Sequence, residues 1–197
     1  MLFCALVAAF FWSGALIADR QKLSQELIRL HVVANSDEAA DQAVKLLVRD
    51  AVTESLRSAM ADVTDAAQAK AYIQENLPKL QAVANSTLEK AGFNPSAVVK
   101  LCRERFDIRH YDTFSLPAGV YESLRITIGD GQGKNWWCVV FPSLCLPAAG
   151  EGFEDVAAGA GFSDALKGSL TGETGYEVRF FLLDALGHLE NIFFLEE

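Results

Sequence analysis

Cys138 and His110 are the two side chains of this sequence best suited to nucleophilic catalysis. A cysteine attacks as a thiolate once a nearby histidine takes its proton, and Asp112 is available to orient that histidine. Such partners need to be close only in the fold, not in the sequence. Cys138, however, is followed by Val139 and Val140 in an apolar run, where burial would raise a thiol pKa. A catalytic cysteine is therefore the less favoured interpretation.

Residues 129–134, Gly-Asp-Gly-Gln-Gly-Lys, superficially suggest a phosphate-binding loop. That loop needs four residues between its glycines, and its lysine is followed by serine or threonine at the start of a helix. Here Asn135 and an apolar Trp-Trp-Cys run follow Lys134 instead. The segment is more typical of a turn between two strands, so we expect no nucleotide cofactor.

The three histidines are dispersed, and no Cys/His pair has the spacing of a zinc site. The acidic residues lack the ordered pattern of a calcium loop. His31 is therefore more typical of a packed, hydrogen-bonded histidine than of a ligand or a base. We expect neither a metal nor any other cofactor.

The net charge of the chain is −9, and no run of five lysines or arginines occurs. Nucleic-acid binding requires a basic surface to neutralise phosphates, so nucleic acid is not an expected partner. The acidity also disfavours attachment to anionic lipid by charge alone.

Residues 2–18 form an uncharged, largely apolar run that ends at Asp19. Its length fits either a secretory signal or a short membrane span, and a buried core helix is the third alternative. No basic residue precedes the run and no clean Ala-x-Ala site follows, so cleavage and anchoring both remain open. We assign residues 1–19 to a signal peptide or membrane anchor. Residues 20–197 are assigned to one domain outside the cytoplasm.

Export would place the cysteines in an oxidising compartment, where disulfides persist. Cys138 and Cys145 lie on either side of a bend at Phe141-Pro142, and we predict that they pair. Two small buried thiols are equally consistent with the sequence, and Cys102 could compete as a partner.

Residues 27–34 alternate in character, which predicts a strand with one face in a core. Ile28, Leu30 and Val32 form the apolar face, and Arg29 and His31 lie on a half-polar face. The strand runs directly into a helix, for which Asn35 and Ser36 are the expected N-caps.

The helix that follows is amphipathic over residues 40–57. Its predicted apolar stripe consists of Ala40, Val44, Leu47, Val48, Ala51 and Val52. Its predicted polar, solvent-facing stripe consists of Gln42, Lys45, Arg49, Thr53 and Arg57.

Further elements follow from periodicity and from turn residues, and they predict an α+β fold. Helices are expected over 66–75, 78–91 and 176–189, with one short helix in the Gly/Ala-rich segment 148–175. Strands are expected over 97–106 and 108–116. The runs 124–128 and 136–141 are predicted to form an antiparallel hairpin.

Two long motifs of this sequence resemble the stage II sporulation protein R family. The first comprises residues 29–37, Arg-Leu-His-Val-Val-Ala-Asn-Ser-Asp, and residues 41–52. The second comprises residues 111–114, 116–125, 133–142 and 144–145. The resemblance is strong over about residues 25–145 and looser at the two ends.

The resemblance implies an intercompartmental signal of endospore formation. Members are made in the forespore and exported to the space between the forespore and mother-cell membranes. There they trigger a membrane-embedded protease of the mother cell to process the precursor of sigma factor E. The resemblance implies no catalytic residues and no small-molecule substrate. A cell-envelope hydrolase that uses Cys138 or acidic residues, and a structural envelope protein, are the alternatives.

A binding signal needs a specific surface with a few anchoring side chains. The strand and the turn after it offer Arg29, His31, Asn35 and Asp37 as partner-binding residues. The end of the predicted hairpin offers Lys134, Asn135 and Trp136. The alternative interpretation is structural, because Asn35 and Asp37 could cap the helix and Arg29 could cover apolar surface.

Overall fold

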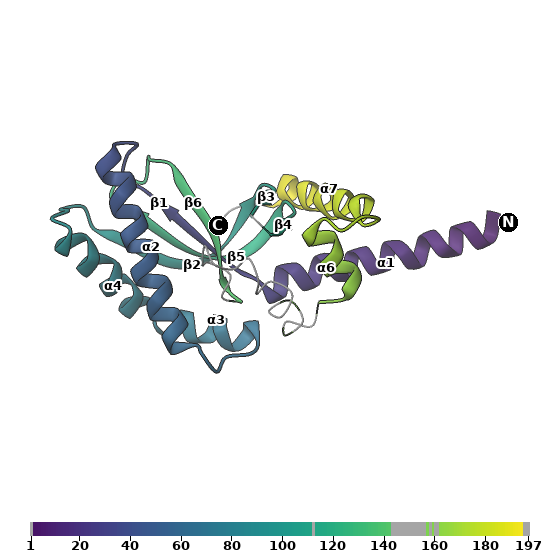
Figure 1. Cartoon of the computed structure of the whole chain (residues 1–197), viewed down its shortest axis with the longest axis horizontal. Coiled ribbons are helices and arrows are strands. Elements are labelled where there is room, and N and C mark those ends of the chain that lie inside the picture. The colour runs from purple at the N-terminus through teal and green to yellow at the C-terminus, as the bar shows by residue number, and fades with distance from the viewer. Residues whose placement is uncertain (1, 112, 143–156, 158, 160–161, 195–197) are drawn as a thin grey trace. The chain divides into compact units, whose positions relative to one another are not determined.

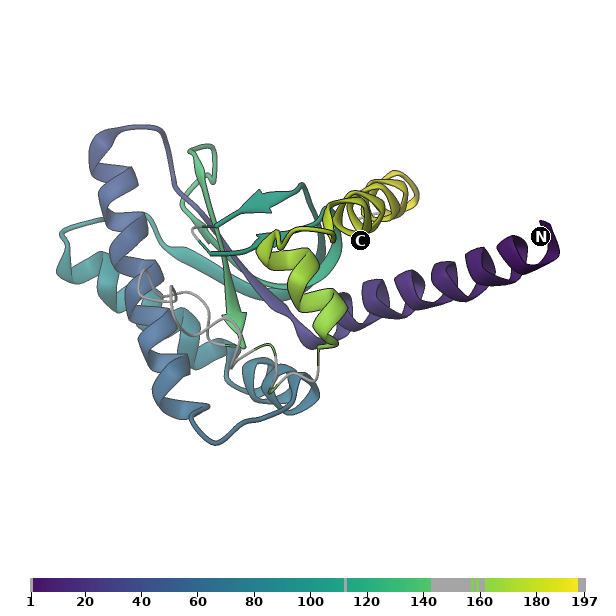
Figure 2. The same ribbon diagram turned by 45° about the vertical axis from the view of Figure 1, so that its right-hand side comes forward.

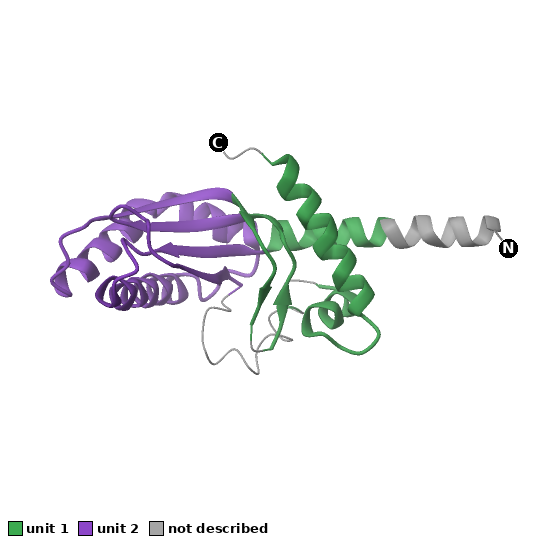
Figure 3. Ribbon diagram, turned by 90° about the horizontal axis from the view of Figure 1, so that it is seen from above, with its two compact units in different colours: residues 1–26, 104–121, 148–197 green, residues 27–103, 122–147 purple. Residues whose placement is uncertain are grey.

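The computed structural model describes the backbone of residues 2–111, 113–142, 157, 159 and 162–194, with side chains from residue 14 onwards. The chain divides into two compact units (Figure 3). Unit 1 comprises Met1–Glu26, Glu104–Tyr121 and Ala148–Glu197, and unit 2 comprises Leu27–Arg103 and Glu122–Pro147. The described elements are α+β, as the sequence predicts.

The central element is a four-stranded mixed sheet in the order β2-β5-β1-β6. Its strands are β1 (Ile28–Val33), β2 (Ala97–Phe106), β5 (Gly119–Ile128) and β6 (Asn135–Phe141). β1 runs parallel to β5 and antiparallel to β6. The predicted hairpin is therefore wrong: β5 and β6 follow each other in sequence, but β1 lies between them and pairs with both.

Three helices of unit 2 contribute to one core with the sheet (Figures 1 and 2). They are α2 (Ala39–Ala59), α3 (Ala66–Glu75) and α4 (Leu77–Lys90). The Asp65 side chain caps α3 by accepting a hydrogen bond from the Gln68 amide at 2.8 Å. Ile28, Leu30 and Val32 of β1 join this core, which confirms the predicted apolar face of the strand.

The long helix α2 follows the predicted pattern only in part. Val44, Val48 and Val52 are buried in the core, but Leu47 is half exposed. The predicted N-caps are wrong, because the helix begins after Glu38, and Glu38 makes no side-chain capping bond. Lys45, placed by its sequence spacing on the solvent-facing stripe, is buried.

Strand β1 is buried along its whole length, including the face that the sequence marks as half polar. Arg29 is 0% exposed and His31 is 5% exposed. The expectation of an open polar strand face is therefore wrong. Alternation of polar and apolar residues showed the two faces of the strand, but it could not show that both are covered.

Unit 1 contains α1 (Leu2–Glu26), α6 (Asp164–Thr171) and α7 (Glu177–Phe193). It also holds a small antiparallel pair, β3 (Arg109–His110) and β4 (Ser115–Leu116). These two short strands replace the single strand predicted over residues 108–116. The short helix α6 and the C-terminal helix α7 confirm two predicted elements.

Two charged pairs join the second half of α1 to α7. Asp19 pairs with Arg179, and Arg20 pairs with Glu190 at 2.6 Å. Arg20 also donates to the Tyr121 hydroxyl at 3.0 Å. Among the residues that the structure describes, no helix has both the length and the apolar character to span a membrane. The signal or anchor assignment of residues 1–19 stays a prediction.

Candidate functional site

The end of β1 positions the residues that the sequence singles out. Val33, the last residue of β1, pairs with Thr127 near the end of β5 and with Asn135 at the start of β6. The loop that joins β5 to β6 must therefore pass over the end of β1. It meets the turn that leads from β1 into α2, so two segments far apart in sequence share one edge of the sheet.

Backbone hydrogen bonds fasten this loop to the turn. The Gly133 amide donates to the Ala34 carbonyl at 2.9 Å, and the Gln132 amide donates to the Asn35 carbonyl at 3.1 Å. A Cβ atom on Gly133 would lie 2.1 Å from the Ser36 carbonyl oxygen. The close approach of the two backbones therefore requires glycine at this position.

Side chains of the turn complete the attachment. The Asn35 Oδ1 atom accepts a hydrogen bond from the Asp130 amide at 3.1 Å, and Asp37 accepts one from the Lys134 amide at 2.7 Å. Asn35 and Ser36 both donate to the Asp41 carboxylate, at 2.8 and 2.6 Å. The bonds from Ser36 and Asn35 hold the pKa of Asp41 below its usual value, because they stabilise the charged form.

The first turns of α2 supply residues that the sequence analysis missed. The Lys45 ammonium donates to the Gln42 side chain at 2.6 Å and to the Lys134 carbonyl at 2.9 Å. Burial lowers the pKa of Lys45, and the charge of Asp37 opposes that effect. The Arg49 guanidinium lies 4.3 Å from the centre of the Trp136 ring, which is cation–π geometry.

The sequence spacing of these helix residues indicates that they share one face of α2. Asp41, Lys45 and Arg49 are four residues apart, so they lie on one face of α2. Sequence reasoning assigned the two basic residues to solvent because nothing in the sequence showed that the loop covers this face.

His31 of β1 and Asn135 of β6 connect these residues to the sheet. His31 Nε2 lies 3.0 Å from the Asn135 Oδ1 atom, and the His31 ring stacks on Trp137 with centroids 3.8 Å apart. This is the packed, hydrogen-bonded histidine that the sequence favoured over a ligand or a base.

We call these residues the polar edge cluster, and it unites six of the seven proposed partner-binding residues. Its members are His31, Asn35, Asp37, Asp41, Gln42, Lys45, Arg49, Lys134, Asn135 and Trp136. The seventh, Arg29, is buried farther along β1 and donates to the Cys138 carbonyl at 3.3 Å.

Only part of the polar edge cluster is open to a partner. Asp37, Lys134 and Asn135 are exposed, and Asn35 and Trp136 are partly exposed. Arg29 and His31 are buried, so the described conformation does not offer their side chains to a partner. A binding role for the seven residues stays a prediction, and the exposed three are the ones that a partner could reach.

The alternative nucleophile Cys138 is in a disulfide, while Cys102 is not in one. A sulfur held in a disulfide has no thiolate with which to attack, so this route to a cysteine hydrolase loses its nucleophile. Cys145 lies outside the described residues, and its pairing with Cys138 stays a prediction. Asp112, the proposed orienting group, also lies outside them.

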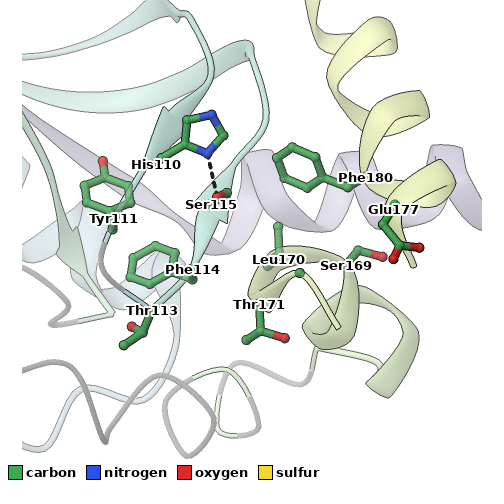
Figure 4. Close-up of a pocket in the computed structure, with 11 residues that line it drawn as sticks. His110, Tyr111, Thr113, Phe114, Ser115, Ser169, Leu170, Thr171, Glu177 and Phe180 are labelled. Carbon is green, nitrogen blue, oxygen red and sulfur yellow. Dashed lines mark hydrogen bonds between the residues drawn. The ribbon is translucent and has the colours of Figure 1, made fainter. Parts of the chain in front are cut away.

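His110 instead lines a hollow of about 460 Å³ in unit 1 (Figure 4). Its Nδ1 atom lies 2.8 Å from the Ser115 Oγ atom, and the two residues are register partners in the β3–β4 pair. Strand pairing alone explains this contact. The apolar lining comes from Tyr111, Phe114, Leu170 and Phe180. The hollow could accept an apolar group.

Among the described residues, no three histidine, cysteine or acidic side chains are grouped closely enough to hold a metal ion. The polar edge cluster is the better-built candidate site, because hydrogen bonds hold its members in place.

Comparison with known proteins identifies the family. The family model described as stage II sporulation protein R matches residues 24–150.

The chain belongs to the stage II sporulation protein R family.

It is also 40% identical over 124 residues to "Stage II sporulation protein R" of Bacillus subtilis (strain 168). That alignment covers 63% of this chain and 55% of the relative, so the chain spans about half the length of the curated protein that it matches. No solved structure matches the chain.

The stage II sporulation protein R family match covers the polar edge cluster completely. It stops before α6 and α7, and it includes only the β3–β4 side of the hollow around His110.

Proposed function

We propose that this chain is an exported signal of endospore formation. It passes from the forespore to the space between the two membranes. There it binds a membrane-embedded protease of the mother cell, which then processes the precursor of sigma factor E. Membership of the stage II sporulation protein R family is the single observation that carries this proposal. The apolar run of residues 2–18, which predicts export, supports it.

The proposed mechanism is differential binding without chemistry by this chain. A ligand shifts a two-state partner only by the difference in its affinity for the two states. A shift from almost fully inactive to almost fully active protease needs about 10⁴-fold tighter binding to the active state, or about 5.5 kcal/mol. A few well-anchored side chains on a rigid surface can supply this difference.

The exposed part of the polar edge cluster is the proposed contact surface. Its backbone is held by the bonds from Gly133 to Ala34 and from Lys134 to Asp37. A surface that is ordered before binding loses little conformational entropy on association, which favours affinity. Lys134 provides a charge at this surface, because only its backbone atoms are used in the bonds to Asp37 and Lys45.

The test is co-expression with the candidate membrane protease and the sigma factor E precursor in a host that does not form spores. The measurement is the ratio of processed to unprocessed precursor. The wild-type chain should raise this ratio strongly, and a wild-type chain without effect would overturn the proposed function.

Lys134→Glu is the sharpest surface variant for the same assay. It reverses one exposed charge and leaves the backbone framework in place, so we expect processing to fall about tenfold, equivalent to about 1.4 kcal/mol. Lys100→Glu, the same change at an exposed position on β2, is the matched control and should process normally. Equal activity of both variants would remove the polar edge cluster from the mechanism but would not exclude the function.

His110→Ala separates binding from catalysis. A binding signal should tolerate the change, because His110 lies at the rim of the hollow and contacts only Ser115 among the bonds described above. Complete loss of processing in a folded His110→Ala variant, with Lys134→Glu silent, would favour a hydrolase instead.

A further inference from the structure

Helix α7 turns a continuous apolar face outward. Val178, Phe181, Leu189, Ile192 and Phe193 have exposed fractions between 53% and 81%. Their spacing places all five on one side of the helix. We call this set the α7 apolar face. Contiguous exposed apolar surface of this kind marks an interaction site more often than it marks ordinary protein surface.

The opposite side of α7 faces the interior of unit 1, and it carries the charges. Arg179 pairs with Asp19, and Glu190 pairs with Arg20. The Asp184 carboxylate accepts a hydrogen bond from the Ala118 amide at 2.7 Å. Turning this polar face to solvent would break these bonds.

Close packing also fixes the rotation of the helix. Leu183 is completely buried, and a Cβ atom on Gly187 would lie 1.7 Å from the Ala118 carbonyl oxygen. Rotating α7 to hide its apolar face would drive larger side chains into this backbone contact. The outward apolar face is thus a consequence of the fold and not an accident of one side-chain rotamer.

The surroundings of α7 indicate what this face contacts. Asp19 and Arg20, which hold α7 by its inward face, come directly after the uncharged run of residues 2–18. The helix is therefore attached to the end of the segment that the sequence assigns to a signal or membrane anchor. The five side chains carry no hydrogen-bonding group, which suits the acyl-chain boundary of a bilayer better than a polar-rimmed protein interface.

We propose that the α7 apolar face docks on the surface of a lipid bilayer. The helix lies in the interfacial plane, over a length of about 25 Å for its seventeen residues. Because the chain has a net charge of −9, insertion of apolar side chains drives this binding, and attraction to anionic headgroups does not. The inference is independent of the proposed signalling function.

The test places an environment-sensitive dye on the face itself, so that the apolar run cannot provide the signal. The full-length chain carries Leu189→Cys for labelling, with Cys4 and Cys102 replaced by serine. The matched control carries the dye at Val98→Cys, an exposed apolar position on β2. Vesicles of phosphatidylcholine should shift the emission of the dye at position 189 to the blue and leave the dye at position 98 unchanged. The shift should survive a rise in salt from about 0.1 to 0.5 M, because screening weakens only charge-driven binding.

A second variant tests the contact by removing two side chains of the α7 apolar face. Phe181→Glu combined with Ile192→Glu should reduce the vesicle-induced shift at position 189 at least about tenfold, because it removes two inserted side chains. Val98→Glu should leave the shift intact.

Four outcomes would overturn the proposal. The dye at position 189 could fail to respond to vesicles, or the dye at position 98 could respond equally. The response could disappear at high salt. It could also arise without lipid and grow with protein concentration, in which case a second copy of the chain occupies the face.

Discussion

Helices α2 and α7 have the same amphipathic periodicity, but they turn opposite faces inward. In α2, Val44, Val48 and Val52 enter the core. In α7, Arg179 and Glu190 turn inward to charged partners, while Phe181 and Ile192 face outward. Periodicity therefore predicts a helix with two different faces, and the neighbouring elements decide which face is buried.

Removal of Arg20, which pairs with Glu190 of α7, should give the largest loss of stability. Arg20→Ala removes the ion pair with Glu190 and the hydrogen bond to the Tyr121 hydroxyl. We expect a loss of about 2–3 kcal/mol, less than for a fully buried pair because Glu190 is partly exposed. Urea unfolding measures the loss, and Lys22→Ala on the same helix is the control. Equal losses in the two variants would show that the inward charges do not hold α7.

The same substitution on the two helices tests the comparison directly. Val48→Ala removes a fully buried side chain of α2 and should cost about 2 kcal/mol through lost burial and a residual cavity. Val178→Ala on the α7 apolar face should change stability by less than about 0.5 kcal/mol. The midpoints of urea unfolding compare them, and similar losses would mean that the α7 apolar face is buried in solution.

The smallest expected effect concerns the turn before α2 and its dependence on pH. Asp41 has a lowered pKa in the fold, so its stabilising contribution is fully present above the unfolded value of about 3.9. The contribution is lost as the pH falls through the lower folded value. Asp41→Asn should therefore destabilise the chain at pH 6 and have a smaller effect at pH 3. Glu89→Gln, at an exposed carboxylate on α4, is the control. An Asp41→Asn effect that is equal at both pH values would contradict the assignment.

Local sequence signals predicted most of the helices of unit 2. The predicted α3 segment, residues 66–75, matches the observed bounds, and the Asp65 side chain next to it forms the cap. Such features depend on neighbouring residues only. The pairing of β5 with β6 was predicted wrongly for the same reason: proximity in sequence favours a hairpin, whereas the observed partner of both strands is the distant β1.

The candidate site shows the same difference between local features, which the sequence predicts, and long-range contacts, which it does not. Turn chemistry and polar character identified Asn35, Asp37, Lys134 and Asn135, and the fold brings them together. Lys45 and Arg49 were assigned to solvent because a helical pattern cannot show that a loop from elsewhere covers one of its faces. Arg29 and His31 were offered as partner-binding residues because the pattern of a single strand cannot show that its second face is covered.

The insertion of β1 between β5 and β6 has a consequence for the order of folding. In the sheet, β5 and β6 lie on either side of β1, which comes earlier in the chain. Pairing between segments that are far apart in sequence is slow. Until β1 arrives, the β5–β6 loop lacks the Ala34 and Asn35 carbonyls that hold it. A folding chain therefore presents the polar edge cluster only after its sheet is complete.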